Sequence, residues 1–258
     1  MIGLLTRIPL RVALRLVLAL QVGLGIALVV EDTREFWGMP GAPDGPLPTA
    51  PVSPGDQTRR YDPRAVPRAP GREAPGGPVR FSDQPGDLTF RFEDGGDLGR
   101  VLLLEGQIGA GDSDRLERAL DGVEPPDTVA LHSPGGDVRE ALRMGALIRE
   151  RGFDTAVTAG AACNSACPLL LASGVERIVS REAWVGMHQA YMAPGTIIPS
   201  RDAVISIQAL QAEVLAHFEA MGVDPLVQVP ALRTPPEEAY FLVPEELERY
   251  RLATRITG

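Results

Sequence analysis

The 258-residue chain contains no lysine, only two cysteines and only three histidines. All 25 basic residues are arginines, so no Ser–Lys catalytic dyad can form anywhere in the chain. Cys163 and Cys167 lack the second pair of Cys or His residues that a structural zinc site needs, so we expect neither a metal nor a cofactor. The net charge of −9 argues against nucleic acid as a partner, because proteins that bind it usually present a basic face.

Residues 1–30 combine arginines with a following apolar run, a pattern typical of membrane targeting. The run 16–30 is short for a full span, which takes roughly 20 residues, but it extends back to Val12 if Arg15 snorkels. A signal anchor and a cleaved signal peptide both fit, and the missing small-x-small cleavage site favours the anchor. We therefore predict a single-pass protein of the inner membrane, anchored through residues 12–30, with its C-terminal domain in the periplasm or another extracytoplasmic space.

Residues 31–80 have the composition of a disordered linker. Eleven of the 24 prolines fall between Pro40 and Pro78, mixed with Gly, Asp and Arg. So few aliphatic residues are present that burial could not offset the entropy of ordering this segment. A spacer between the first segment and a folded domain is the main interpretation, and a Pro-rich ligand for a partner protein is the alternative.

Residues 81–258 alternate between strand-like and helix-like segments. Strands are expected in 88–92, 100–106, 128–131, 153–158 and 176–185, and helices in 112–120, 137–151, 165–172, 200–221 and 245–251. This order predicts an α/β fold with a mostly parallel sheet. We expect Asp137 to cap the second helix, and Asp112 or Ser113 to cap the first.

Ser133-Pro-Gly-Gly136 lies between a buried strand and a helix. Two glycines there allow a tight turn that exposes backbone N–H groups beside a helix N-terminus. Such groups stabilise negative charge on a substrate oxygen, as an oxyanion hole does. A plain strand-to-helix turn is the alternative interpretation.

Ser165 lies between small residues at the start of an apolar helix. A serine in this position often serves only as a helix N-cap. Alternatively it is a nucleophile, with the N–H of Ala166 as a second oxyanion donor.

A nucleophilic serine needs a base near neutral pH, and without lysine that base has to be a histidine. His188 follows a predicted strand and precedes a glycine-containing loop, so it is the first candidate. His132 directly precedes the glycine turn and is the second candidate. His217 lies within the long helix, where we expect a structural role.

The order of these motifs resembles the Clp-type serine protease subunit, within the ClpP/crotonase superfamily. Ser-Pro-Gly-Gly comes first, then a serine ahead of an apolar helix, then Met-His-Gln, and the resemblance covers residues 101–253. It implies repeated β-β-α units with a mostly parallel sheet. It also implies Ser165 as nucleophile, His188 as base, and Gly136 and Ala166 as oxyanion donors.

The acid that orients the histidine in this family is not evident. The corresponding segment, 233–239, contains no Asp, and a gapless match places Thr234 at that position. Glu237 is the tentative substitute, with Glu238 beside it. A Ser–His–Glu triad, a Ser–His dyad and an inactive site all remain open.

The two cysteines are a second departure from the family pattern. Cys163 and Cys167 flank Ser165, and in an oxidising compartment they could form a disulfide across it; two buried thiols are the alternative. The predicted function is that of an extracytoplasmic serine hydrolase, a peptidase acting on peptides or unfolded protein, with homo-oligomers as an open option. The alternative is an inactive, membrane-tethered interaction or assembly protein of the same fold.

Overall fold

The computed structural model describes residues 9–37, 54–55, 57–61, 86–192 and 198–258. The chain forms two compact units, Met1–Pro46 and Leu47–Gly258. Most of the predicted linker, together with residues 81–85 of the predicted domain, lies outside the described residues.

Within the first unit, the helix α1 runs from Leu10 to Trp37 and so continues past the predicted end of the apolar segment at residue 30. In the described part of the chain, no helix is both long enough and apolar enough to cross a membrane. The predicted single-pass anchor through residues 12–30, and with it the inner-membrane localisation, is therefore wrong.

The second unit contains strands and helices that alternate along most of its length. The strands are β1 (Thr58–Arg60), β2 (Thr89–Asp94), β3 (Arg100–Glu105), β4 (Thr128–His132), β5 (Asp154–Val157), β6 (Ala162–Asn164), β7 (Arg177–Ser180), β8 (Trp184–Met187), β9 (Glu238–Phe241) and β10 (Arg255–Thr257). The helices are α2 (Asp112–Leu120), α3 (Val138–Glu150), α4 (Cys167–Ala172), α5 (Ser200–Ala220), α6 (Gln228–Arg233) and α7 (Pro244–Arg249), with short 3-10 turns at Gly96–Leu98 and Pro225–Val227.

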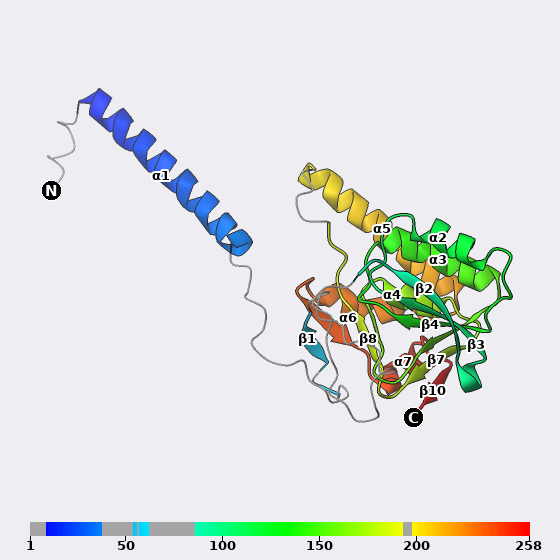
Figure 1. Ribbon diagram of the computed structural model, residues 1–258. Helices are drawn as coiled ribbons and strands as arrows, with labels where there is room; N and C mark the ends of the chain where they lie inside the picture. Colours follow the sequence, from blue (N-terminus) through cyan, green and yellow to red (C-terminus); the bar gives the residue numbers. More distant parts are fainter. Residues whose placement is uncertain (1–8, 38–53, 56, 62–85, 193–197) are drawn as a thin grey trace. The chain divides into compact units, whose positions relative to one another are not determined.

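The larger sheet has the strand order β10-β7-β5-β4-β3-β2 (Figure 1). All its neighbouring strands are parallel except the antiparallel pair β2–β3. Every residue of β4 is buried, as expected of a central strand in a sheet covered by helices. The prediction of an α/β fold with a mostly parallel sheet is confirmed.

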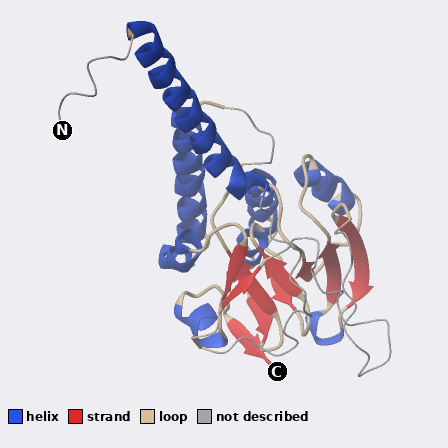
Figure 2. Cartoon of the chain, turned by 90° about the vertical axis from the view of Figure 1, so that its left-hand side faces the viewer, coloured by secondary structure: helices blue, strands red, loops and turns tan. Residues whose placement is uncertain are grey.

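A smaller sheet has the order β1-β9-β8-β6, and the two sheets form separate groups of strands in Figure 2. β6 and β8 are parallel, whereas β9 runs antiparallel to both of its neighbours. The segment predicted as one strand over 176–185 is in fact two strands in different sheets. The exposed pair Arg181 and Glu182 turns the chain between them.

The two sheets meet beside the Ser-Pro-Gly-Gly turn. Ser133, which follows β4, donates its N–H to the carbonyl of Ala162 at 2.7 Å and accepts from Asn164 N–H at 3.0 Å. These bonds continue the parallel arrangement across the junction of the sheets. The C-terminal ends of β4 and β6 therefore lie next to each other.

The helix caps differ in part from prediction. The Asp137 carboxylate accepts from the N–H groups of Arg139 and Glu140, so this predicted cap is confirmed. The N-cap of α2 is Gly111, and neither Asp112 nor Ser113 caps the helix. The acceptor at this end comes from α3 instead: the Glu140 carboxylate binds the N–H of Gly111 at 2.9 Å and that of Ser113 at 3.0 Å.

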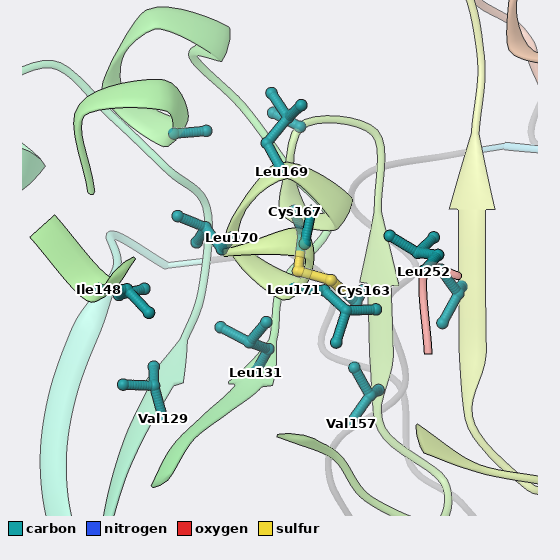
Figure 3. Packing of buried hydrophobic residues seen from close by; sticks show 14 of the residues in the cluster. Val129, Leu131, Ile148, Val157, Cys163, Cys167, Leu169, Leu170, Leu171 and Leu252 are labelled. Carbon is teal, nitrogen blue, oxygen red and sulfur yellow. A yellow bond between two sulfur atoms is a disulfide. The ribbon is translucent and has the colours of Figure 1, made fainter. Parts of the chain in front are cut away.

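The core lies between the larger sheet and the helices α3 and α4. Figure 3 shows Ile148 of α3 and Leu170 of α4 facing Val129 and Leu131 of β4. Every residue of α4 is buried, so this short helix is fixed from all sides. The position of Ser165, two residues before α4, is therefore set by the core.

Candidate active site

Ser165 occupies a tight corner between β6 and α4. Its φ angle is +58°, and Arg251 is the other non-glycine residue with a positive φ in the part of the chain the structure describes. Such a conformation costs on the order of 1–3 kcal/mol and persists only where its surroundings impose it. Nucleophilic serines of other hydrolases occupy strained strand-to-helix turns of this kind. The helix predicted over residues 165–172 begins at Cys167 in the structure, so Ser165 lies at the corner before the helix.

A disulfide closes this corner. Cys163 at the end of β6 and Cys167 at the start of α4 are bonded, with their Cα atoms 5.1 Å apart. Both cysteines are fully buried, and Figure 3 shows the bridge packed among leucines of the core. Of the two sequence alternatives for these residues, the structure contains the disulfide.

The glycine turn lies directly against the serine corner. A Cβ atom on Gly135 would come within 2.5 Å of the Ser165 Cβ and 2.8 Å of the Ala166 nitrogen. A Cβ on Gly136 would lie 2.0 Å from the Ile108 carbonyl oxygen, and both glycines have positive φ angles. Only glycine fits at these two positions, because a side chain at 135 would push the turn away from Ser165 and one at 136 would push it away from Ile108.

Two backbone N–H groups are free to bind a substrate oxygen here. The N–H of Gly135 is occupied, since it donates to the Ser133 hydroxyl at 3.1 Å. Among the described residues, the N–H groups of Gly136 and Ala166 have no hydrogen-bond acceptor. These are the two donors that the sequence resemblance implies, and unpaired N–H groups at such a corner can bind negative charge that develops on a substrate oxygen.

The pairing of two strands brings His188 close to Ser165. β6 and β8 are parallel neighbours, with Cys163 opposite Val185 and Asn164 opposite Gly186. Ser165 and His188 follow the C-terminal ends of these two strands, which lie about 4.8 Å apart in a sheet. Ser165 also donates its N–H to the Gly186 carbonyl at 2.8 Å, which joins the corner to β8.

The His188 ring is held in one orientation by a backbone carbonyl. Its Nδ1 atom lies 2.8 Å from the carbonyl oxygen of Gln189. A carbonyl can only accept, so Nδ1 carries the proton and the lone pair is on Nε2. Nε2 is buried and has no hydrogen-bond partner within the described structure. This is the tautomer that a general base needs.

Burial lowers the pKa of His188, because a charged imidazolium loses its hydration there. The hydrogen bond to the Gln189 carbonyl and the charge of Glu237 act in the opposite direction but are weaker. The imidazole is therefore neutral near pH 7 and able to accept a proton.

Glu237 does not orient His188 as a triad acid would. The side chain is exposed, and among the described residues no hydrogen bond joins its carboxylate to the imidazole. Thr234, at the expected acid position, acts through its backbone: its carbonyl accepts from Gln189 N–H at 2.9 Å. The Gln189 side chain also donates to the Leu232 carbonyl at 2.8 Å. The last turn of α6 and Thr234 after it thus hold Gln189, and the Gln189 carbonyl holds the His188 ring.

Ser165 and His188 both line one cavity of about 690 Å³. Gly135 and Gly136 form part of its wall, and apolar side chains form much of the remainder: Ile108, Val138, Met192, Ile207 and Leu210. Because Nε2 has no partner, the Ser165 hydroxyl does not bond to it in this structure. Catalytic hydrogen bonds of this kind often form only when substrate is bound.

The other two histidines point elsewhere. His132 is buried, and its Nδ1 accepts from Ala162 N–H at 3.0 Å, so it supports the junction of the sheets. His217 packs α5 onto α4, with Nε2 3.0 Å from the Leu169 carbonyl and 3.2 Å from the Ser173 hydroxyl. Neither lines the cavity. In the described part of the chain, no three His, Cys, Asp or Glu side chains are grouped to hold a metal ion.

No family model matches this chain, and no curated protein is significantly similar to it. The site therefore rests on its geometry and on the motif order alone.

Sequence reasoning missed two parts of the site. The sequence predicts no role for Gln189, although its carbonyl orients the ring of His188. Tyr61 lies in the predicted linker, yet its side chain lines the cavity. One signal could have revealed it: residues 57–62 are free of Pro and Gly within a segment otherwise rich in both.

Proposed function

We propose that this protein is a serine hydrolase of the Clp-type protease kind. The observation that carries the proposal is that a strained serine, a neutral histidine and Gly136, whose N–H is unpaired, line one cavity, and that the residue after the serine, Ala166, has a second unpaired N–H. Each feature alone is common in proteins with no catalytic role. Together they supply the groups that acyl transfer requires.

In the proposed reaction, the Ser165 hydroxyl attacks a substrate carbonyl while its proton passes to Nε2 of His188. The carbonyl oxygen becomes negatively charged and binds the N–H groups of Gly136 and Ala166. His188 then gives its proton to the leaving amine as the C–N bond breaks, which leaves an acyl-enzyme. Water, activated by the same Nε2, releases the acid product and restores the serine.

The backbone carbonyl of Gln189 takes the place of the usual acid in this scheme. Loss of the aspartate from a Ser–His–Asp triad lowers kcat about 10⁴-fold, chiefly because the histidine takes the wrong tautomer. A carbonyl at 2.8 Å from Nδ1 selects the right tautomer, although it supplies no negative charge. We therefore expect a slower enzyme than one with a full triad.

A fluorophosphonate probe, which reacts with activated serines, tests this proposal on the full-length protein. We expect the wild type to be labelled on Ser165, and Ser165→Ala to abolish labelling. His188→Gln should slow labelling by about 10²-fold or more, as expected for loss of a general base. Ser206→Ala is the matched control, because Ser206 lines the same cavity on α5 but should be dispensable.

The proposed substrates are peptides or unfolded protein segments, as the family resemblance implies. Cleavage of an unfolded protein such as casein by the wild type, and not by Ser165→Ala, would support this class. Labelling without such cleavage would indicate a hydrolase of another substrate class.

One observation favours a different function: among the described residues, no carboxylate bonds to His188. An inactive protein of the same fold, acting in interaction or assembly, could retain the corner and the glycine turn for structural reasons. Absence of labelling in a well-folded wild type would favour that function.

A further inference from the structure

We propose that Tyr61 is a positioning residue for His188, and that the strand β1 carries it into the site. This assignment rests on the proposed function, since His188 acts as a base only if Ser165 is a nucleophile. The assignment makes residues 57–61 part of the active site, although they lie far upstream of the motifs that contain Gly136, Ser165 and His188.

The first support is the way residues 57–61 bind the smaller sheet. β1 pairs with β9 over Thr58–Arg60. The pairing continues at both ends, because Phe241 N–H donates to the Gln57 carbonyl at 2.8 Å and Tyr61 N–H donates to the Glu237 carbonyl at 2.9 Å. The backbone on each side of β1 is thus fixed, up to and including Tyr61.

Gln57 anchors the start of this segment through its side chain. Its amide nitrogen donates to the Glu246 carboxylate at 2.6 Å and to the Phe241 carbonyl at 3.2 Å. Glu246 lies on α7 and also accepts from the Tyr240 hydroxyl at 2.7 Å. Two independent anchors, one in the backbone and one in a side chain, therefore hold the segment in register.

The second support is what the Tyr61 side chain contacts. Its ring centroid lies 5.0 Å from that of His188, at an interplanar angle of 38°. Its hydroxyl donates to the carbonyl of Pro134, directly before the two glycines of the turn. One side chain thus touches both the base and the oxyanion turn, and it lines the cavity between them.

The third support is how little else holds the imidazole. His188 makes one hydrogen bond, through Nδ1, and Nε2 makes none in the described structure. Tyr191 lies against it as a second ring, with centroids 5.9 Å apart. Ring contacts restrict the tilt of the imidazole and exclude water, which a single hydrogen bond cannot do. The rings of Tyr61 and Tyr191 therefore help to hold the imidazole in its orientation, as the acid of a catalytic triad would do through a hydrogen bond.

The test compares Tyr61→Ala and Tyr61→Phe in the full-length protein by the rate of fluorophosphonate labelling. Tyr61→Ala removes the ring, and we expect a loss of about 10-fold, the upper range for an aromatic contact. Tyr61→Phe keeps the ring and loses only the hydroxyl bond to Pro134, so its loss should be smaller, about 3-fold or less. Equal rates for Tyr61→Ala and the wild type would overturn the proposal.

A second measurement separates positioning from a general loss of stability. With only three histidines, the titration of His188 can be followed by NMR. The groups around its ring are Tyr61, Tyr191, the Gln189 carbonyl and the charge of Glu237. Removing the Tyr61 ring admits water, so the pKa of His188 should rise towards its ordinary value in Tyr61→Ala but not in Tyr61→Phe. An unchanged titration in Tyr61→Ala would contradict the positioning role.

Proline substitutions test the part played by β1. By the alternation of antiparallel pairs, the N–H of Arg59 points towards β9 and that of Arg60 points away. Arg59→Pro should lower the labelling rate as Tyr61→Ala does, whereas Arg60→Pro and the side-chain control Arg59→Ala should not. Equal rates for both proline variants and the wild type would overturn the role of the strand.

The outcomes also distinguish this proposal from the one on which it rests. If the wild type is not labelled at all, the proposed function fails and the positioning role fails with it. If Ser165 is labelled and the Tyr61 variants match the wild type, only the positioning role fails.

Discussion

Gly135 lies so close to Ser165 that a Cβ atom on it would come within 2.5 Å of the serine Cβ. The glycine turn and the serine corner belong to different sheets, yet they pack as tightly as neighbours in one chain segment. The position of the glycine turn relative to Ser165 therefore depends on the absence of a side chain at Gly135.

Gly135→Ala should abolish labelling of Ser165, because the new methyl group must displace the turn or the serine. The positive φ of Gly135 adds a backbone cost of about 1–2 kcal/mol. Gly122→Ala is the matched control: it has a positive φ but no atom within 4 Å of the added Cβ. We expect both variants to lose stability on thermal unfolding and only Gly135→Ala to lose labelling. Full labelling of Gly135→Ala would contradict the proposed arrangement.

Reduction of the Cys163–Cys167 disulfide should slow the labelling of Ser165. The bridge joins the two residues that flank Ala166, Ser165 and Asn164, so its loss frees the strained corner to relax. The bridge closes a short loop and should stabilise the protein by about 2 kcal/mol in the chain-entropy view. Denaturant unfolding and probe labelling, each with and without reductant, measure the two effects.

The control for that prediction is the double variant Cys163→Ala/Cys167→Ala, which should respond to reductant in neither assay. If mass spectrometry shows the wild-type bridge to be reduced while labelling is unchanged, the disulfide has no part in shaping the site.

The labelling rate should rise with pH, with a midpoint below the ordinary histidine pKa of about 6.5. Burial lowers the pKa of His188, so the neutral base persists to lower pH than in an exposed histidine. Below that pKa the ring is protonated and cannot accept the Ser165 proton. A midpoint above about 6.5 would contradict this assignment of the base.

The variant Glu237→Gln tests whether Glu237 is the acid of a catalytic triad or affects His188 only through its charge. The Glu237 carboxylate raises the pKa of His188, so its removal should move the midpoint of the pH profile further down. The plateau rate at high pH should stay nearly unchanged, because no hydrogen bond is lost. A fall of the plateau by about 10³-fold or more would instead identify Glu237 as the acid of a triad.

Glu140→Ala should lower the free energy of unfolding by roughly 2–3 kcal/mol, since it leaves two N–H groups of α2 without their acceptor. Burial by itself raises the pKa of Glu140, but the hydrogen bonds from Gly111, Ser113 and Arg143 outweigh it and lower the pKa to about 2. The stabilisation is therefore present above the unfolded-state value of about 4.5 and is lost as pH falls through about 2. Glu150→Ala, at an exposed position on the same helix, should change stability by less than about 0.5 kcal/mol. Urea unfolding at several pH values gives both results.

The elements with a strong pattern could be predicted from sequence. β3 and β4 are apolar runs ended by turn residues, and α3 has both a clear apolar face and its Asp137 cap. The short strands β1, β6, β9 and β10 could not be predicted, because three or four residues carry no usable periodicity. Each of these strands forms because it pairs with a strand that is distant in the sequence.

The same division holds for the site. The sequence could single out Ser165, His188 and Gly136, which the structure places around one cavity, because each stands in a local motif. The orienting group could not, because a backbone carbonyl leaves no trace in the sequence. The segment around Thr234, where the sequence predicts an acidic side chain, contacts Gln189 through the main-chain carbonyl of Thr234.

Ser165 and His188, the proposed nucleophile and base, follow strands of one sheet, whereas the glycine turn follows a strand of the other. Ser165 and His188 follow adjacent strands β6 and β8, so their separation is as rigid as that strand pair. The Gly136 donor follows β4 and meets them across the bonds of Ser133. In the proposed mechanism, a shift of one sheet relative to the other would therefore change the distance from Gly136 to Ser165 but not the distance between Ser165 and His188.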